Sequence, residues 1–338
     1  MKSEFDFINK IRQRSISSKI GDDCAVLPKD CETDLVVTTD LLVEDIDFRL
    51  EWAKPEFLGH KALAISLSDV AAMGAKPVWA MLSVGIPAQV WKTDFVEKFY
   101  DGWFALAEKF GIELVGGDVS KTPDKIVIDS IVAGEVKKGK AILRSTAQPN
   151  NLIFVTGELG GAAAGLRLLE NGESLENTKH KNLLLRQLAP NPQVEIGQIL
   201  SKKNLATSTI DLSDGLSSDL AQICKESKVG AKIYAEKIPI DKNLKNLPAL
   251  KNVEVEIQEK SLSPFLPLFL SSALHGGEDF ELLFTVNPKN QKKILRLKNE
   301  SKNYAFSCIG EITKNAEIIE LISKEKTQVL TPKGYRHF

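Results

Sequence analysis

The chain has 338 residues, of which 43% are hydrophobic and 26% charged, and its formal net charge is −1. This length predicts two domains, each large enough to bury its own core. The near balance of 44 basic and 45 acidic residues argues against nucleic acid or a membrane surface as the main partner. No window approaches the ~20 apolar residues of a membrane helix, and the start of the chain has no apolar signal core. The four cysteines have neither metal-type spacing nor a disulfide framework, so we predict a cytoplasmic protein with reduced thiols.

Strands and helices alternate through the first half of the chain. A short helix is predicted at 4–14, and an apolar run predicts a strand at 34–40 that ends on Asp40. A second strand follows at 78–86 and an amphipathic helix at 95–110, stopped by Gly111. The segment 112–118 predicts a strand and a Gly-Gly turn that delivers Asp118 at its tip, and 125–136 predicts one more strand.

Polar and turn residues at 137–151 predict a domain boundary, with an N-terminal domain at 1–140 and a C-terminal domain at 141–338. The second half opens at 152 with a strand, a glycine turn and a helix. That turn lacks the Gly-Lys-Ser/Thr ending of a P-loop, which favours a tight connection. A strand, acidic turn and helix follow at 207–227, a Gly-Gly turn and strand at 275–286, and a charged helix and loop at 287–303. The fold class is α+β or α/β, with the strand order left open.

The segment 59–75 predicts a helix that is apolar almost all round, with Asp69 as the one charged residue between Lys61 and Lys76. Such a helix is usually buried, and a buried lone carboxylate is costly unless it is paired or binds a metal. Taken alone, a loop cap or an arginine partner explains Asp69 equally well.

Aspartates beside Gly, Ser or Thr recur at the ends of apolar runs. A single acidic turn is more often an Asx turn or a helix cap, but recurrence at five turns favours a site for metal and polyphosphate. Many like charges cannot converge without cations, and oxygen ligands without nearby Cys or His favour Mg²⁺. There is no Walker A or protein-kinase signature. The recurring aspartates are Asp22, Asp23, Asp40, Asp69, Asp118, Asp211 and Asp214.

Eight motifs, taken in order, resemble those of the thiamine-monophosphate kinase family, within the aminoimidazole-ribonucleotide-synthetase-like superfamily. They are GDDCAVL (21–27), TTDLLVE (38–44), GHKALAISLSDVAAMGAKP (59–77), LVGGD (114–118), LRS (143–145), IDLSDGLSSDL (210–220), GGEDFELLF (276–284) and GYRHF (334–338). The resemblance implies the two-domain architecture of that superfamily and a homodimer paired through the N-terminal sheets, with ATP near the subunit interface. It also implies phosphoryl transfer from ATP to thiamine monophosphate with several Mg²⁺ ions. The second ionisation of a phosphate monoester lies near pH ~6, so no catalytic general base is expected.

Roles for individual residues are implied by the same resemblance. The metal positions are Asp23, Thr38, Thr39, Asp40, Asp69, Asp118, Asp211 and Asp214. The ATP positions are Tyr100, Gly117, Asp118, Arg144 and Ser213. The acceptor positions are Asp47, Glu278 and Tyr335, with Asp47 standing where the family usually has His.

Two alternatives remain beside this kinase. One is another ATP-dependent member of the superfamily with a different phosphorylated acceptor. Selenophosphate synthetase would carry a reactive Cys or selenocysteine near the N-terminus, and the hydrogenase-maturation relative a C-terminal Cys, so both fit poorly. The other is a non-catalytic homologue that binds nucleotide or thiamine diphosphate, against which the full set of carboxylates argues, because clustered anions without a metal-phosphate task are destabilising.

Overall fold

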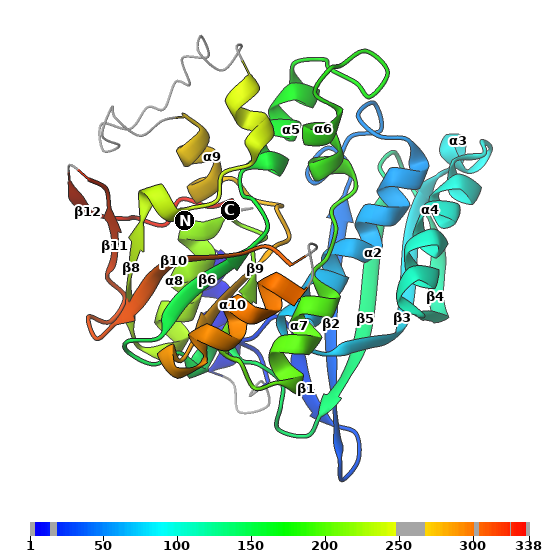
Figure 1. Cartoon of the computed structure of the whole chain (residues 1–338). Coiled ribbons are helices and arrows are strands. Elements are labelled where there is room, and N and C mark those ends of the chain that lie inside the picture. Colours follow the sequence, from blue (N-terminus) through cyan, green and yellow to red (C-terminus); the bar gives the residue numbers. More distant parts are fainter. Residues whose placement is uncertain (1–3, 14–18, 248–267, 301–303, 325, 336–338) are drawn as a thin grey trace.

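The computed structural model describes residues 4–13, 19–247, 268–300, 304–324 and 326–335, and this part of the chain forms two β-sheets flanked by helices (Figure 1). The first sheet has the order β1-β2-β5-β3-β4, in which β3 and β4 are parallel and the other neighbours antiparallel. Its strands are β1 (Ala25–Pro28), β2 (Thr33–Val43), β3 (Lys76–Pro87), β4 (Glu113–Thr122) and β5 (Val127–Lys137).

Helix α2 (Pro55–Ala72) covers one face of this sheet, and α4 (Phe95–Phe110) packs beside it, after the short α3 (Ala88–Trp91). Two glycines allow α2 and α4 to approach closely. A Cβ on Gly59 would lie 1.8 Å from the Phe99 carbonyl oxygen, and one on Gly102 would lie 1.9 Å from that of Glu56. The far side of α2 contacts the second half of the chain, so the prediction of a helix buried all round is confirmed.

The second sheet has the order β12-β11-β8-β10-β6-β9-β7. Its strands are β6 (Leu152–Thr156), β7 (Ala206–Asp211), β8 (Gly230–Tyr234), β9 (Leu282–Val286), β10 (Phe306–Thr313), β11 (Ile319–Ile322) and β12 (Thr327–Val329). The remaining α-helices are α1 (Glu4–Arg12), α5 (Gly161–Glu170), α6 (Lys181–Leu188), α7 (Val194–Lys202), α8 (Leu216–Ser227), α9 (Leu268–His275) and α10 (Gln291–Glu300). One buried apolar cluster joins α2 and the first sheet to α7, β9 and α10, so the two halves share a core.

Two predicted strand ends are wrong. Strand β2 does not end at Asp40, because its pairing with β5 continues as far as Val43 opposite Val127. Gly117 and Asp118 do not form a turn either, since β4 runs through them to Thr122. Gly117 has φ +154°, and a Cβ there would lie 1.9 Å from the Leu82 carbonyl oxygen, so the glycine serves close strand packing rather than chain reversal.

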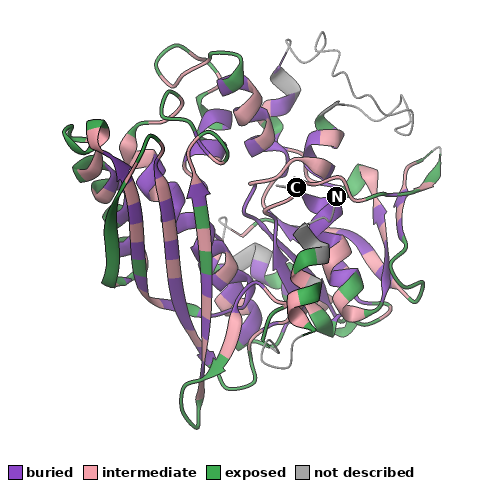
Figure 2. Cartoon of the chain, turned by 180° about the vertical axis from the view of Figure 1, so that it is seen from behind, coloured by how far each residue is buried: buried purple, intermediate pink, exposed green. Residues whose placement is uncertain are grey.

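No helix among the described residues covers the other face of the first sheet, and its edge strand β4 is exposed along most of its length (Figure 2). On this face, Leu41 of β2 is 59% exposed and Met81 of β3 is 38% exposed. In the edge strand β4, Val115 is 47% exposed and Val119 is 52% exposed. Among the described residues, no helix is long and apolar enough to span a membrane.

Candidate functional site

An ion pair between the half-buried Arg144 and the buried Asp23 marks the junction of the two sheets. Arg144 lies in the short 3₁₀ turn Arg144–Thr146, and its Nη2 and Nε donate to the two carboxylate oxygens of Asp23 at 2.7 and 3.2 Å. Its backbone amide donates to Asp22 Oδ1 at 2.7 Å. Burial alone would lower the pKa of Arg144, but Asp23, together with Asp69 and Asp211, raises it. The guanidinium is therefore a permanent charge of fixed orientation.

Three carboxylates converge beside this arginine. Asp23, Asp69 of α2 and Asp211 at the end of β7 each offer an oxygen, and these oxygens all lie within 4.8 Å of one another. Burial and the neighbouring carboxylates raise the pKa of Asp69 and of Asp211 well above the usual range. One guanidinium does not neutralise three carboxylates, and a hard divalent cation bound by oxygen ligands fits this set.

The hydroxyl groups around α2 orient the carboxylates of the site. Thr38 Oγ1 donates to Asp69 Oδ2 at 2.5 Å, and Ser66 Oγ donates to Asp40 Oδ2 at 2.6 Å. Burial raises the pKa of Asp40 to about 6, against the lowering effect of the Ser66 hydrogen bond. Thr38 and Asp40 are two residues apart in β2, so both side chains lie on the face that α2 covers and are directed towards the carboxylate cluster.

The acidic turn after β7 is hydrogen-bonded to the loop that precedes β9. The backbone amide of Glu278 donates to Ser213 O at 2.7 Å, and that of Phe280 donates to Leu212 O at 3.0 Å. Glu278 has φ +65°, a left-handed conformation that costs energy for a residue with a side chain. The GGEDF loop is thus bound to the turn that carries Asp211 and Asp214.

Glu278 in turn contacts α2 and α6. Lys61 Nζ lies 2.6 Å from Glu278 Oε1, and Gln187 Nε2 donates to Glu278 Oε2. Lys61 and Gln187 line a groove together with Asp47, Trp52 and Phe57. This groove combines aromatic surface with charged groups, a composition suited to an aromatic organic molecule, and its cavity of about 20 Å³ must widen to admit one.

Other acidic residues of the same loop have a structural role. Asp279 accepts hydrogen bonds from the backbone amides of Gly160 and Ala162 at the start of α5, and Glu281 accepts from Arg186 Nη1 at 3.1 Å. Burial raises the pKa of both carboxyls, and the Arg186 charge opposes this. They hold α5, α6 and the start of β9 together. Sequence reasoning missed this role because Arg186 lies on a helix 95 residues before Glu281.

Comparisons with known proteins identify the family of this chain. The family model for the N-terminal domain of AIR synthase related proteins matches residues 21–136, and the model for their C-terminal domain matches residues 148–322. A thiamine-monophosphate kinase of Bacillus subtilis is 34% identical over 99% of both chains. That of Escherichia coli K12 is 37% identical over 99% of this chain and 98% of its own.

The chain belongs to the thiamine-monophosphate kinase family.

Solved structures extend this result. A structure described as AaThiL complexed with AMPPCP and TMP superposes with a TM-score of 0.82, at 30% identity over 99% of this chain and 97% of that one. A hydrogenase maturation protein HypE, at 15% identity and a TM-score of 0.69, shares the fold alone.

The structure brings some positions implied by the family resemblance together and leaves others apart. Within one chain, Asp23, Asp69 and Asp211 form the cluster, with Arg144, Thr38 and Asp40 against it and Ser213 and Asp214 in the adjoining turn. The backbone amide of Tyr335 donates to Asp214 O at 3.4 Å, which holds the described part of the C-terminal motif to the same turn. Residues 336–338 of that motif lie outside the described residues.

Asp118 and Thr39 point to the opposite face of the first sheet. In the strand register Asp118 lies opposite Ser83, and Ser83 opposite Asp129, so these three side chains share the open face. Thr39 Oγ1 donates to Asp129 Oδ1 at 2.6 Å on that face. Tyr100 lies on α4, packed edge-to-face on Phe99, and Gly117 lies inside β4.

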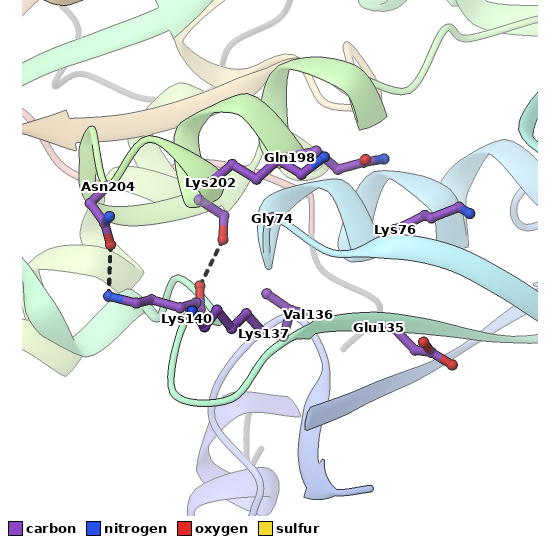
Figure 3. A pocket seen from close by; sticks show the side chains of 10 residues that line it. Gly74, Lys76, Glu135, Val136, Lys137, Lys140, Gln198, Lys202 and Asn204 are labelled. Atoms are coloured by element: carbon purple, nitrogen blue, oxygen red, sulfur yellow. Dashed lines mark hydrogen bonds between the residues drawn. The ribbon is translucent and has the colours of Figure 1, made fainter. Parts of the chain in front are cut away.

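A separate cavity of about 300 Å³ lies at the other end of α2, where Gly74 meets α7 (Figure 3). Lys140 Nζ donates to Asn204 Oδ1 at 2.8 Å across it, and Ser201 Oγ donates to the Lys140 carbonyl oxygen at 2.9 Å. Its carboxylate, Glu135, is paired with Lys29 at 2.5 Å. These contacts join the two halves of the chain away from the carboxylate cluster.

Proposed function

We propose that this chain transfers the γ-phosphoryl group of ATP to thiamine monophosphate and releases ADP and thiamine diphosphate. The observation that carries this function is the convergence of Asp23, Asp69 and Asp211 beside Arg144, in a member of the thiamine-monophosphate kinase family. The structure that superposes with a TM-score of 0.82 is described as a complex with AMPPCP and TMP.

Asp23, Asp69 and Asp211 are proposed to hold Mg²⁺, with Asp40, Asp214, Thr38, Thr39 and Asp118 as further metal positions. When bound, Mg²⁺ screens the repulsion between two phosphate groups and neutralises charge in the transition state. Arg144, fixed by Asp23, offers guanidinium N–H groups to phosphate oxygens. Tyr100, Gly117 and Ser213 complete the proposed ATP site.

The acceptor is proposed to lie along α2. Asp69 follows Lys61 by eight residues, which is about 12 Å along a helix at ~1.5 Å per residue. Thiamine monophosphate has a phosphate at one end and an aminopyrimidine at the other. Its phosphate then lies near the carboxylate cluster, and its rings in the groove lined by Trp52 and Phe57 near Glu278 and Asp47.

Phosphoryl transfer needs no side chain that removes a proton, because the acceptor phosphate is already an oxyanion at neutral pH. The residues of the site act by position and charge. Arg144 is oriented by two hydrogen bonds, and Asp69 by the Thr38 hydroxyl, before substrates arrive. Such preorganisation lowers the barrier because these groups do not reorganise during the reaction.

We also propose that each chain has two domains, at 1–140 and 141–338, and that two chains form a homodimer through the open face of the first sheet. The support is the exposed apolar surface of Leu41 and Met81 on that face. Pairing at this face brings Asp118 and Asp129 to the subunit interface, which gives Asp118 a route into an ATP site there.

The activity is tested by incubating the purified chain with Mg-ATP and thiamine monophosphate. Equal amounts of ADP and thiamine diphosphate are expected. ADP and inorganic phosphate without thiamine diphosphate, or transfer to a different phosphate acceptor alone, would contradict the proposal.

A further inference from the structure

We infer that Lys61 is a positioning residue for the acceptor substrate, which acts by holding Glu278 across the junction of the two halves of the chain. This inference rests on the proposed function and adds to it a residue that sets acceptor affinity. Lys61 belongs to α2, which packs on the first sheet, whereas Glu278 belongs to the loop before β9 of the second sheet.

The Lys61–Glu278 ion pair is buried on the lysine side. The Lys61 side chain is 5% exposed and that of Glu278 is 29% exposed, at an Nζ–Oε1 distance of 2.6 Å. The free energy needed to remove an ammonium group from water usually exceeds the attraction gained in an isolated ion pair. Replacing a buried ion pair by apolar side chains is therefore often neutral for stability. A stability role therefore does not explain the pair well, and the place of Lys61 in the lining of the groove indicates a role in binding.

A second contact limits Glu278 to one orientation. Gln187, which is 4% exposed, donates from its amide nitrogen to Glu278 Oε2, so each oxygen of this carboxylate has its own donor. Because the nitrogen faces the carboxylate, the amide oxygen of Gln187 points the other way, and it has no hydrogen-bond partner among the described residues. Donors on α2 and on α6 thus fix one carboxylate from two sides.

The backbone of Glu278 adds a third restraint. Its amide is bound to Ser213 O at 2.7 Å, and its left-handed φ of +65° is sustained only when its surroundings hold it there. Ser213 lies two residues after Asp211 of the carboxylate cluster. The ion pair with Lys61 and the backbone bond to Ser213 thus hold Glu278 between the groove-lining helix α2 and the turn that follows Asp211.

The test compares Lys61→Met, which keeps the side-chain length without the charge, with Lys61→Arg, which keeps the charge. We expect Lys61→Met to raise the KM for thiamine monophosphate about tenfold or more, since loss of a partner of a desolvated charge is costly, with the KM for ATP unchanged. Lys61→Arg is expected to recover part of this loss. Lys54→Met is the matched control, because Lys54 also pairs with the second half of the chain, at Glu176, but both side chains are more than 60% exposed.

A double-mutant cycle separates positioning from simple packing. If Lys61 acts through Glu278, the Lys61→Met/Glu278→Gln protein has the same acceptor KM as Glu278→Gln alone. The inference would be overturned if the effects of the two substitutions on the acceptor KM multiply in the double variant, or if Lys61→Met alone leaves that KM unchanged. In either case, a wild-type chain that makes thiamine diphosphate leaves the proposed function standing. A wild-type chain that makes no thiamine diphosphate would overturn both. If Lys61→Met does not fold, Gln187→Met removes the other contact to Glu278, and an unchanged acceptor KM there overturns the inference.

Discussion

Asp69 combines burial with repulsion at a single residue. Its carboxylate lies within 4.8 Å of those of Asp23 and Asp211. Burial, followed by the charges of Asp40, Asp211 and Asp23, raises its pKa well above the usual range. The folded chain therefore holds this group in a state that costs energy without a cation. The same arrangement that makes the site suitable for Mg²⁺ makes the metal-free protein less stable.

Asp69→Asn is expected to lower turnover on the order of 10²-fold or more, because a carboxylate ligand is lost from the proposed metal site. In EDTA the same variant is expected to melt at a higher temperature than the wild type, because it removes a buried charge. Turnover and thermal melting measure the two effects. Asp94→Asn is the control, since that carboxylate is exposed and paired with Lys98. Wild-type turnover in Asp69→Asn would contradict the metal assignment.

Asp47 gives a second prediction at this scale. Its Oδ2 accepts a hydrogen bond from the Val43 amide at 2.8 Å, so part of the carboxylate is directed to its own turn while the residue lines the groove. We expect Asp47→His to lower the KM for thiamine monophosphate with kcat little changed, because an imidazole donates to a phosphate that a carboxylate repels. Loss of the Val43 contact is expected to cost about 1 kcal/mol of stability. Steady-state kinetics decide: an inactive Asp47→His would show that the carboxylate itself is required.

At the scale of elements, one histidine hydrogen-bonds α9 to α8 beside their apolar contact. His275, the last residue of α9, has its Nδ1 2.8 Å from Ser217 Oγ of α8, and burial, helped by Lys333, lowers its pKa to about 4. An unfolded chain takes up this proton near pH ~6.5, before the folded chain does. The stability that depends on neutral His275 is therefore complete above about pH 6.5 and is lost as the pH falls towards 4.

His275→Gln is expected to remove this acid sensitivity. Between pH 7 and pH 5, the melting temperature of the variant should fall less than that of the wild type. Circular dichroism melts at several pH values measure the difference. Melting curves that shift in parallel for both proteins would show that His275 does not titrate on unfolding in this range.

The elements best predicted from sequence are those with strong local signals. Helix α2 followed from its apolar circumference, and α4 ends at Phe110 because Gly111 takes the left-handed conformation. The ends of β2 and β4 could not be predicted, because pairing with neighbouring strands extends both past their aspartates. Lys61–Glu278 and Arg186–Glu281 were missed for a related reason, since each joins residues distant in sequence. An isolated lysine at the start of an apolar helix was the one available signal for Lys61.

For the whole molecule, the family and the reaction were predictable because motifs extend through both halves of the chain, and the relatives match over nearly its full length. The location of Asp118 was not predictable in this way. It lies on the face of the first sheet opposite to Asp40 and Asp69, so its proposed role depends on a second copy of the chain.

The proposed dimer is tested by sedimentation equilibrium, with an expected mass of twice the 37.2 kDa of one chain. Leu41→Arg should shift the protein towards monomer, because it introduces a charge at an apolar position that is 59% exposed on the open face. A wild-type chain that is monomeric at micromolar concentration would contradict the proposal.

The most direct test of the central claim is the conversion of thiamine monophosphate by wild-type protein with Mg-ATP, followed by chromatography of both products. The account predicts one thiamine diphosphate for each ADP, with the reaction abolished by EDTA and strongly reduced in Asp69→Asn. ADP release without thiamine diphosphate, or full activity after metal removal, would contradict it.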